Sequence, residues 1–314
     1  MSPHGRPKGE SLRPRAEGIS MTAGTRGPIV NALTVDVEDY FQVSALAPHI
    51  ARHDWDHIPC RVEANVHRLL ALFEAQGAQA TFFTLGWVAE RYPQLVRAIV
   101  QAGHELASHG YGHQRASDQS REEFLHDVMH AKALLEDIAG VPVRGYRAPS
   151  FSIGAANQWA FDCLAEAGYR YSSSVYPVQH DHYGMPEASR FPFQVRDGLT
   201  EIPITTVQVL GRNLPAGGGG YFRLLPYALS NWAIREFNRK EARPALFYMH
   251  PWEIDHEQPR VPDTSLKTRF RHYVNLHRTE ARLTRLLGDF HWGRMDRVFG
   301  IDPVAVRQPT SLAA

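Results

Sequence analysis

Short apolar runs alternate along the chain with stretches in which apolar residues recur every three or four positions. A short continuous run favours a buried strand, and the longer spacing favours an amphipathic helix. We expect strands at residues 29–37, 80–84, 104–108, 143–147, 169–175 and 245–250. We expect helices at residues 62–73, 88–100 with Pro93 as an interruption, 122–138, 155–167, 225–238 and 266–287. Strands that alternate with helices indicate a parallel sheet.

The alternation stops between residues 176 and 222, where loop-forming residues dominate. Residues 217–220 are four consecutive glycines, and only residues 201–210 have the pattern of a strand or hairpin. The alternation then resumes with the helix expected at 225–238. We therefore expect irregular structure in this part of the chain, between regular elements on either side.

Polar side chains stand at the C-terminal ends of four expected strands. Asp36 and Glu38 end the first strand, and His109, Arg147 and His250 follow or end three later ones. Both (β/α) barrels and doubly wound sheets place their sites at strand C-termini. Four strand ends that converge on one point favour a closed ring, and no GxGxxG sequence follows the first strand. We therefore predict an α/β fold, an irregular (β/α) barrel with fewer than eight strands.

The composition allows a large core and excludes some partners. The chain has 314 residues, of which 43% are hydrophobic and 21% charged, which suits one large α/β domain or two smaller ones. The formal net charge of +1 gives no global field that would recruit nucleic acid or anionic lipid. Basic residues between 267 and 285 are interleaved with acidic and apolar ones, as on a solvated helix face. We expect no nucleic-acid partner.

The cysteines and the first residues bear on location. Cys60 and Cys163 each stand alone, so no thiolate zinc site is expected, and sparse cysteine fits a reducing compartment. No apolar run reaches the ~18 residues that span a bilayer. Residues 1–27 lack the apolar core of a signal peptide and are expected to be disordered. The expected location is the cytoplasm, and the oligomeric state stays open.

His109 and His113 stand four residues apart after an expected strand, with glycines between them. Imidazole is the commonest side-chain ligand of zinc and related metals, and such a pair can close on one ion where the backbone turns. The segment is not a HExxH helix, because the residue three after Glu105 is Ser108. A loop that is merely rich in histidine is the alternative, since the chain holds 17 of them.

Asp36, Glu38 and Asp39 supply carboxylates at the end of the first expected strand. Residues i and i+2 of a strand share a face, so Asp36 and Glu38 project together. Two carboxylates on one face repel unless a cation or a division of labour separates them. One of them, with the two histidines, would form a metal site with open positions, while the other acts as a base. Asp39 replaces Glu38 if a turn begins at once, and a solvated strand end is the alternative.

Arg147 and His250 supply two further groups at strand ends. Arg147, in the sequence Arg-Ala-Pro149, can hold a carboxylate through two hydrogen bonds and keep it ionised; an ordinary surface ion pair is the alternative. An apolar strand delivers His250 beside aromatic residues, among them Trp252. A lone histidine is more often structural than catalytic, but its equivalent position at a strand end favours a role in the site.

The order of these elements resembles that of the polysaccharide deacetylase family, the NodB-homology or family 4 carbohydrate esterases. An acidic strand end, S-H-x-x-x-H, R-x-P and a late apolar-x-H follow one another over about residues 29–255. Residues 34–41 and 180–184 further resemble a subgroup found beside exopolysaccharide and exosortase gene clusters. The resemblance implies a NodB-like barrel, seven-stranded, at 28–255, a C-terminal helical extension at 256–300 packed on the barrel, and a tail at 301–314.

The resemblance also implies a role for each residue of the site. Ser172 is one departure, because related sequences often have an aspartate at this position. Tyr183 and Trp252 are candidates for stacking against sugar rings, and Pro149 belongs to the R-x-P element. The implied roles are general base for Asp36, orientation of that base for Arg147, general acid for His250, metal ligands for His109, His113 and either Glu38 or Asp39, and substrate binding for Pro149, Tyr183 and Trp252.

The implied activity is metal-dependent hydrolysis of N-acetyl groups on an amino-sugar polysaccharide or its lipid-linked precursor, in exopolysaccharide biosynthesis. The implied cofactor is a divalent metal, with zinc expected. A lipid-linked substrate would bring the enzyme to the membrane face. One alternative is an allantoinase-like amidohydrolase that acts on a small cyclic amide. Another is a catalytically dead carbohydrate-binding protein, although such proteins usually lose a ligand or the base, and this chain retains all of them.

Overall fold

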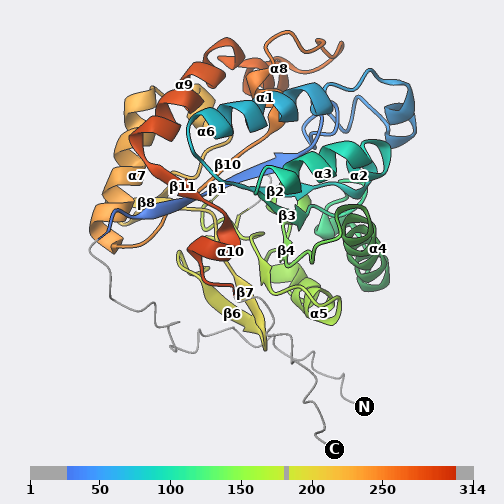
Figure 1. The fold of residues 1–314 in the computed structure, drawn as a ribbon, viewed down its shortest axis with the longest axis horizontal. Coiled ribbons are helices and arrows are strands. Elements are labelled where there is room, and N and C mark those ends of the chain that lie inside the picture. Colours follow the sequence, from blue (N-terminus) through green and yellow to red (C-terminus); the bar gives the residue numbers. More distant parts are fainter. Residues whose placement is uncertain (1–26, 180–183, 302–314) are drawn as a thin grey trace, which may run out of the picture.

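The structure, a computed structural model, describes residues 27–179 and 184–301. In its main sheet, seven strands run parallel in the order β10-β1-β2-β3-β4-β5-β7. Their bounds are β1 Val30–Val37, β2 Thr81–Thr84, β3 Glu105–Ser108, β4 Gly145–Tyr146, β5 Tyr171–Ser172, β7 Leu199–Glu201 and β10 Leu246–Met249. An eighth strand, β6 Phe193–Arg196, pairs antiparallel with β7. The α/β fold with a mostly parallel sheet, expected from the sequence, is confirmed (Figure 1).

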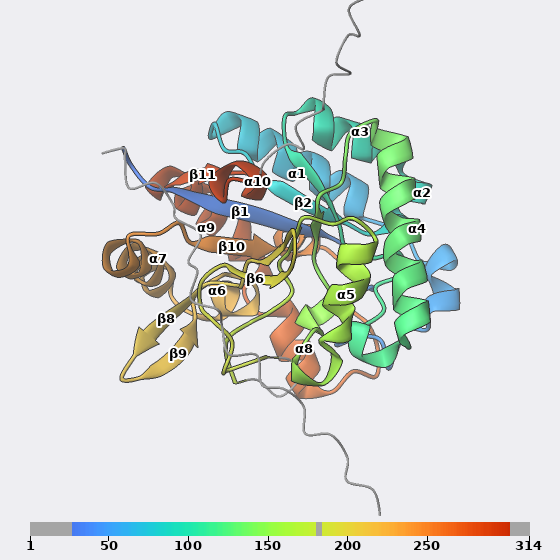
Figure 2. The same cartoon turned by 90° about the horizontal axis from the view of Figure 1, so that it is seen from below.

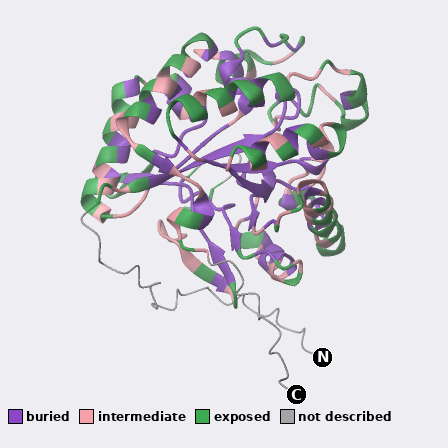
Figure 3. Cartoon of the chain, in the orientation of Figure 1, coloured by how far each residue is buried: buried purple, intermediate pink, exposed green. Residues whose placement is uncertain are grey.

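β1 lies inside the sheet and carries Asp36. Its residues from Asn31 onward are all buried, with no alternation between buried and exposed positions. Such a run is typical of a parallel strand covered on both faces. Thr34 pairs with Tyr248 of β10 and with Thr81 of β2, so these two strands flank β1. Figure 3 shows the strands buried and the outer faces of the helices exposed.

Helices surround the sheet (Figures 1 and 2). They include α1 Val62–Ala75, α2 Gly86–Arg91, α3 Pro93–Gln101, α4 Arg121–Ala139, α5 Trp159–Glu166, α7 Tyr227–Glu241 and α9 Leu276–Asp289. One apolar cluster joins α1, α7 and α9 to β1, through Val66, Ile234 and Leu283 among others. A second cluster joins α4 and α5, with Phe124 and Leu164 among its members. Helices from both ends of the chain therefore share a core with the central strands.

Two predicted helices contain interruptions. The break expected at Pro93 is confirmed, since Pro93 is the first residue of α3, a position where its missing N–H removes no helical hydrogen bond. The prediction of one helix at 266–287 is wrong. α8 Leu266–Tyr273 stops, and Asn275 adopts a φ of 54° before α9 begins. The Asn275 side chain donates a hydrogen bond to the carbonyl oxygen of Arg223 (2.9 Å), a distant contact that a local pattern does not reveal.

The strand or hairpin expected at 201–210 is divided between β7 and a separate hairpin, β8 Thr206–Val209 and β9 Arg212–Pro215. The glycines that follow run beside β10, where Gly218 forms a bridge with Tyr248. At its φ of 108°, a Cβ on Gly218 would lie 2.2 Å from the Tyr248 carbonyl oxygen, so only glycine fits. The sheet ends at β10 and β6, and the glycine segment covers the β10 edge with a single bridge.

The chain after residue 255 forms α8, α9, a short strand and α10 Met295–Val298. The strand, β11 His291–Gly293, pairs parallel with the start of β1 and was not expected from the sequence. The C-terminal part of the chain thus contributes to the main sheet as well as to the helices around it. The predicted division into a barrel at 28–255 and an extension at 256–300 stays a prediction.

Some expectations fall outside the described residues. The disorder expected for residues 1–27 and the tail at 301–314 lie there, apart from residues 27 and 301, and so does Tyr183. Among the helices of residues 27–179 and 184–301, none combines the length and the apolar character needed to cross a bilayer.

Candidate active site

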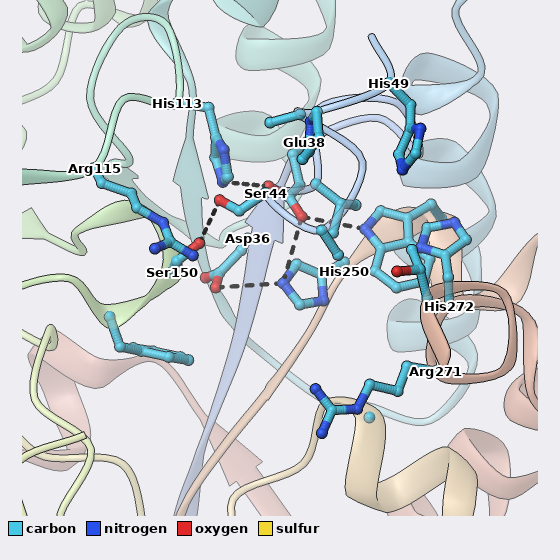
Figure 4. Close-up of a pocket in the computed structure, with 18 of the residues that line it drawn as sticks. Asp36, Glu38, Ser44, His49, His113, Arg115, Ser150, His250, Arg271 and His272 are labelled. Carbon is cyan, nitrogen blue, oxygen red and sulfur yellow. Dashed lines mark hydrogen bonds and ion pairs between the residues drawn. The ribbon is translucent and has the colours of Figure 1, made fainter. Parts of the chain in front are cut away.

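The C-terminal ends of the parallel strands open into a cavity of about 1020 Å³ (Figure 4). Asp36 reaches the cavity from β1 and Glu38 from the loop that follows it. His109 comes directly after β3, and His250 directly after β10. Parallel strands end on the same side of a sheet, which is why side chains so far apart in sequence meet here.

Glu38, His109 and His113 together can hold a metal ion. One donor atom from each lies within 4.8 Å of the other two, and all three residues are buried. His113 Nε2 stands 2.6 Å from Glu38 Oε2, yet that oxygen has no hydrogen-bond partner of acceptable geometry among the described residues. A buried carboxylate oxygen without a hydrogen bond is costly. The donor set, two imidazoles and a carboxylate, therefore fits a divalent cation such as zinc.

The backbone orients His109 as a ligand. Its Nδ1 lies 2.8 Å from the carbonyl oxygen of Arg147, so Nδ1–H donates there and Nε2 keeps its lone pair for the ion. Burial and the nearby charge of Asp36 have opposite effects on the pKa of His109. Burial has the larger effect, and the pKa is lowered to about 4. The ring is neutral near pH 7, which is the form that binds a metal.

A strained turn between the two histidines brings His113 back toward Glu38. Gly110 has a φ of 74°, and a Cβ on it would approach Asp127 Oδ2 to 2.8 Å. Asp127, on α4, also accepts a hydrogen bond from the Tyr111 backbone N–H (3.1 Å). His113 itself has a φ of 54°, which non-glycine residues seldom adopt. The turn lets both rings face the same point without a helix.

Glu38 is ionised in this environment. Burial alone would raise its pKa, but the adjacent imidazoles of His113 and His250 outweigh burial and lower the pKa to about 2. The other carboxylate oxygen, Oε1, accepts a hydrogen bond from Trp252 Nε1 (3.2 Å). An ionised carboxylate held on one oxygen, with the second turned to the histidines, is suited to bind a cation.

Asp39, the other acid predicted as a third ligand, does not face this cluster. Its carboxylate accepts hydrogen bonds from the backbone N–H groups of Arg61 (2.5 Å) and Val62 (2.9 Å), at the start of α1. It also accepts one from the N–H of Tyr40 (2.8 Å). The structure therefore brings Glu38 to the histidines and gives Asp39 the role of a cap for α1.

Asp36 is paired with Arg147, a fully buried arginine. Arg147 Nη1 donates to Asp36 Oδ1 (2.6 Å) and to Thr34 Oγ1 (2.8 Å), and Nη2 donates to Ser173 Oγ (3.0 Å). The guanidinium also lies over the ring of Phe83, 4.1 Å from its centroid. These contacts fix one oxygen of Asp36 and leave the other, Oδ2, turned to the cavity.

His250 faces both acids from the other side. Its Nε2 lies 3.9 Å from Asp36 Oδ2 and 3.6 Å from Glu38 Oε1 (Figure 4). Its Nδ1 lies 2.7 Å from Glu253 Oε1. Burial alone would lower the pKa of His250, but the carboxylates of Glu38, Glu253 and Asp36 outweigh it and raise the pKa to about 9. The imidazole is therefore protonated near neutral pH and can donate a proton.

Two residues predicted to bind substrate are buried, and their role stays a prediction. Trp252 lines the cavity, and its ring stacks with those of His250 (5.2 Å between centroids) and His272 (4.4 Å). Pro149 is buried and is absent from the cavity lining, although its neighbours Ala148 and Ser150 belong to it. The sequence pattern could not separate an aromatic ring that lines a cavity from one that supports a catalytic group.

The segment around Ser172 contains an acid that the sequence analysis missed. Glu201 Oε1, buried at the end of β7, accepts hydrogen bonds from the backbone N–H groups of Ser174 and Val175 (both 2.8 Å). The Ser172 hydroxyl donates to Ser174 Oγ (2.9 Å), which in turn accepts the N–H of Ala148 (2.9 Å). This network supports the segment that carries Arg147.

Glu253 and Arg223 were also missed. Glu253 stands three residues after His250, in a short 3-10 helix, Pro251–Ile254. Residues three apart on such a helix lie on the same side, so the spacing H-P-W-E carried a signal for this contact. Arg223 carried no such signal, because it comes from a distant helix, α6 Gly220–Leu224.

Two family models match the chain in succession. The model described as polysaccharide deacetylase matches residues 51–172, and the model described as a domain of unknown function (DUF3473) matches residues 173–300. Residues 51–172 therefore carry the similarity to polysaccharide deacetylases. The first match contains His109, His113 and Arg147, the second contains His250, and Asp36 precedes both.

Curated proteins that are similar to part of the chain are named deacetylases. A peptidoglycan-N-acetylglucosamine deacetylase from Bacillus cereus is 33% identical over 103 residues, 33% of this chain and 46% of the relative. A peptidoglycan deacetylase from Helicobacter pylori is 28% identical over 36% of this chain and 38% of its own length. A chitooligosaccharide deacetylase from Azorhizobium caulinodans is 34% identical over 25% and 38%. The chain spans less than half the length of each.

A solved structure shows the same fold. It comes from Mycobacterium smegmatis and is described as a candidate polysaccharide deacetylase. Its TM-score is 0.55 at 22% identity, and the match covers 91% of this chain and 96% of that one. The match includes both halves of the chain, so the shared fold extends over the region of unknown function.

Proposed function

We propose that the chain is a metal-dependent hydrolase that removes N-acetyl groups from an amino-sugar polysaccharide or its precursor. One observation carries the proposal: the donors of Glu38, His109 and His113 share a cavity with Asp36 and His250. A cation site, a carboxylate and a protonated imidazole at one point are the groups that hydrolysis of an unactivated amide requires.

Glu38, His109 and His113 would hold the metal, and zinc suits two imidazoles and one carboxylate. A divalent ion at this position supplies positive charge that polarises the acetyl carbonyl and acidifies water. Three protein ligands would leave positions on such an ion for substrate and water. The second carboxylate, Asp36, is held by Arg147 and stays available as a base.

The chain's own residues would handle the protons. As the water oxygen forms a bond to the acetyl carbonyl carbon, Asp36 Oδ2 accepts the proton that the water loses. The bond between that carbon and the sugar nitrogen then breaks, and the nitrogen keeps both electrons of the bond. His250 Nε2 donates a proton to this nitrogen. One water is consumed for each acetyl group, and the products are acetate and a free amino sugar.

The names of the curated relatives support an N-acetylated sugar as the substrate class, since they refer to peptidoglycan and chitooligosaccharides. A cavity of about 1020 Å³ has room for more than one sugar residue. A role in exopolysaccharide biosynthesis, a lipid-linked substrate, contact with a membrane face and a cytoplasmic location stay predictions from the sequence.

Acetate release tests the proposal. The zinc-loaded protein would be incubated with N-acetylglucosamine oligomers and, separately, with allantoin as a cyclic amide, and acetate and new amines would be measured. We expect acetate and amine in equal amounts from the oligomers and no reaction with allantoin. Hydrolysis of allantoin alone would favour the cyclic-amide alternative, and binding of oligomers without any acetate would favour a carbohydrate-binding protein.

A further inference from the structure

Glu253 links His250 to the rest of the chain. Its Oε1 accepts hydrogen bonds from the Nδ1–H of His250 (2.7 Å) and from the backbone N–H of His250 (3.0 Å). Its Oε2 accepts one from Nε of Arg223 (2.7 Å). Glu253 and Arg223 are both buried, at 1% and 3% exposure.

Arg223 is itself held by the junction between α8 and α9. Its Nη1 donates to the carbonyl oxygen of His272 (2.6 Å), near the end of α8. Its own carbonyl oxygen accepts hydrogen bonds from Asn275 Nδ2 (2.9 Å) and from Nη1 of Arg282 on α9 (2.8 Å). Asn275, whose positive φ separates α8 from α9, is therefore one of the residues that fix Arg223.

The same junction supports the aromatic residue between His250 and the metal donors. The rings of His272 and His250 both stack on the ring of Trp252. Trp252 Nε1 donates to Glu38 Oε1 (3.2 Å), and His272 Nε2 lies 2.7 Å from Gln258 Oε1. A continuous series of buried contacts thus runs from α8 to both His250 and Glu38.

We propose that the C-terminal region, residues 173–300, positions the general acid His250. Glu253 and Arg223 are positioning residues that act through this histidine. The inference rests on the proposed function and deepens it. Because Glu253 accepts the hydrogen of Nδ1, the remaining N–H of His250 is directed from Nε2 toward the cavity and Asp36. Because Arg223 holds Glu253, the carboxylate cannot turn away. The region of unknown function then positions the general acid as well as supplying it, although it supplies none of the three metal donors.

A leaving-group comparison tests this role. An amine leaves a sugar carbon poorly and needs a proton, whereas para-nitrophenolate leaves without one. In Glu253→Gln we expect kcat for an N-acetylglucosamine oligomer to fall about 10- to 100-fold, as for other residues that orient a reacting group. Hydrolysis of para-nitrophenyl acetate should stay within about twofold of the wild type, because this leaving group needs no proton from His250. The KM for the oligomer and the metal content should also stay within about twofold.

Glu241→Gln is a matched control. Glu241 lies in the same C-terminal region, on α7, and pairs with Arg190 at 3.0 Å, but neither residue lines the cavity. This variant loses an arginine-bound carboxylate by the same chemical change. We expect its kcat for the oligomer to be unchanged.

A second pair of variants covers the case in which Glu253→Gln does not fold. Arg223→Lys keeps a cation but loses the Nε–H that holds Glu253, and it should give a smaller loss with the same dependence on the leaving group. In a His250→Ala background, Arg223→Lys should cause no further loss, because Arg223 and Glu253 act only through that imidazole.

Equal losses on both substrates, loss of the metal or an additive effect in the His250→Ala background would overturn the proposal. So would unchanged kcat for the oligomer in folded Glu253→Gln. Failure of the proposed function has a different result, since the wild type would then release no acetate from the oligomer at all.

Discussion

The two sides of the cavity are built differently. The metal side consists of Glu38, His109 and His113, which come from two loops, and His109 and His113 stand four residues apart. The acid side consists of His250, Glu253 and Arg223, which are joined by buried contacts to α8 and α9. The metal side would be completed by an ion, whereas the acid side is completed by the chain itself. Substitutions on the two sides should therefore have different effects on metal content and on acetate release.

Loss of a metal donor should have the largest effect. In His109→Ala we expect the metal to be lost and acetate release to fall by more than about 100-fold, since even residues that only orient a ligand cost 10- to 100-fold. Metal content by atomic absorption and acetate release would be measured on the same samples. His126→Ala, which removes a histidine from the surface of α4, is the control and should keep both. Full zinc stoichiometry in His109→Ala would contradict the ligand assignment.

Loss of the general acid should have a smaller effect, and it should spare the metal. In His250→Ala we expect kcat for an acetylated oligomer to fall about 10²- to 10⁴-fold, the usual contribution of a positioned acid. The zinc content should match that of the wild type, because His250 is not one of the three donors. If zinc were lost with the imidazole, the two sides of the cavity would not be separable, and the comparison would be wrong.

Asp39→Ala separates the acid that caps a helix from the acid that faces the metal donors. We expect the free energy of unfolding to fall by about 1–3 kcal/mol, because three backbone N–H groups lose their acceptor. The metal content should be unchanged. Chemical denaturation and metal analysis would measure the two quantities, and loss of zinc from folded Asp39→Ala would return this residue to the metal side.

Glu105 forms a second contact between the C-terminal region and the sheet. It is the first residue of β3, at the end opposite to His109. The carboxylate accepts hydrogen bonds from Thr81 Oγ1 (2.6 Å), Tyr171 Oη (2.9 Å) and the backbone N–H of Asp296 (3.1 Å). Burial, together with the charge of Asp296, raises the pKa of Glu105 from 4.5 to about 7. The folded chain therefore retains a proton that the unfolded chain loses between these pH values, and stability falls as pH rises through them.

Glu105→Gln should remove this pH dependence. Between pH 5 and 7 we expect the wild type to lose roughly 1–3 kcal/mol of stability relative to the variant, the smallest effect of this series to detect. Urea denaturation at several pH values, with zinc bound throughout, would measure the difference. Parallel stability curves for the two proteins would show that Glu105 is ionised in the folded state.

The sequence predicted one side of the cavity better than the other. Asp36, Glu38, His109 and Arg147 follow strands whose apolar runs are short and clear, and strand ends meet by the rules of parallel sheets. Asp39 could not be excluded from the local pattern, because its helix-capping role depends on Arg61 and Val62, more than 20 residues away. The stacking of Trp252 on His272 could not be read from the local pattern either, because the two residues lie 20 positions apart.

The C-terminal region was the least predictable part. The apolar spacing of residues 266–287 is helical throughout, and only the contact of Asn275 with Arg223 explains why the helix is interrupted. β11 is three residues long, and its pairing with β1 joins segments more than 250 residues apart in sequence. Local propensity carries no information about such contacts, which form only when the rest of the sheet is in place.

A titration of metal against activity tests the central claim most directly. The protein would be stripped of metal, zinc would be added in steps, and acetate released from an N-acetylglucosamine oligomer would be measured at each step. We predict that acetate release rises in proportion to bound zinc, stops rising at one ion per chain, and is absent at full occupancy in Asp36→Asn. Acetate release from the metal-free protein, or undiminished release by Asp36→Asn, would contradict the account.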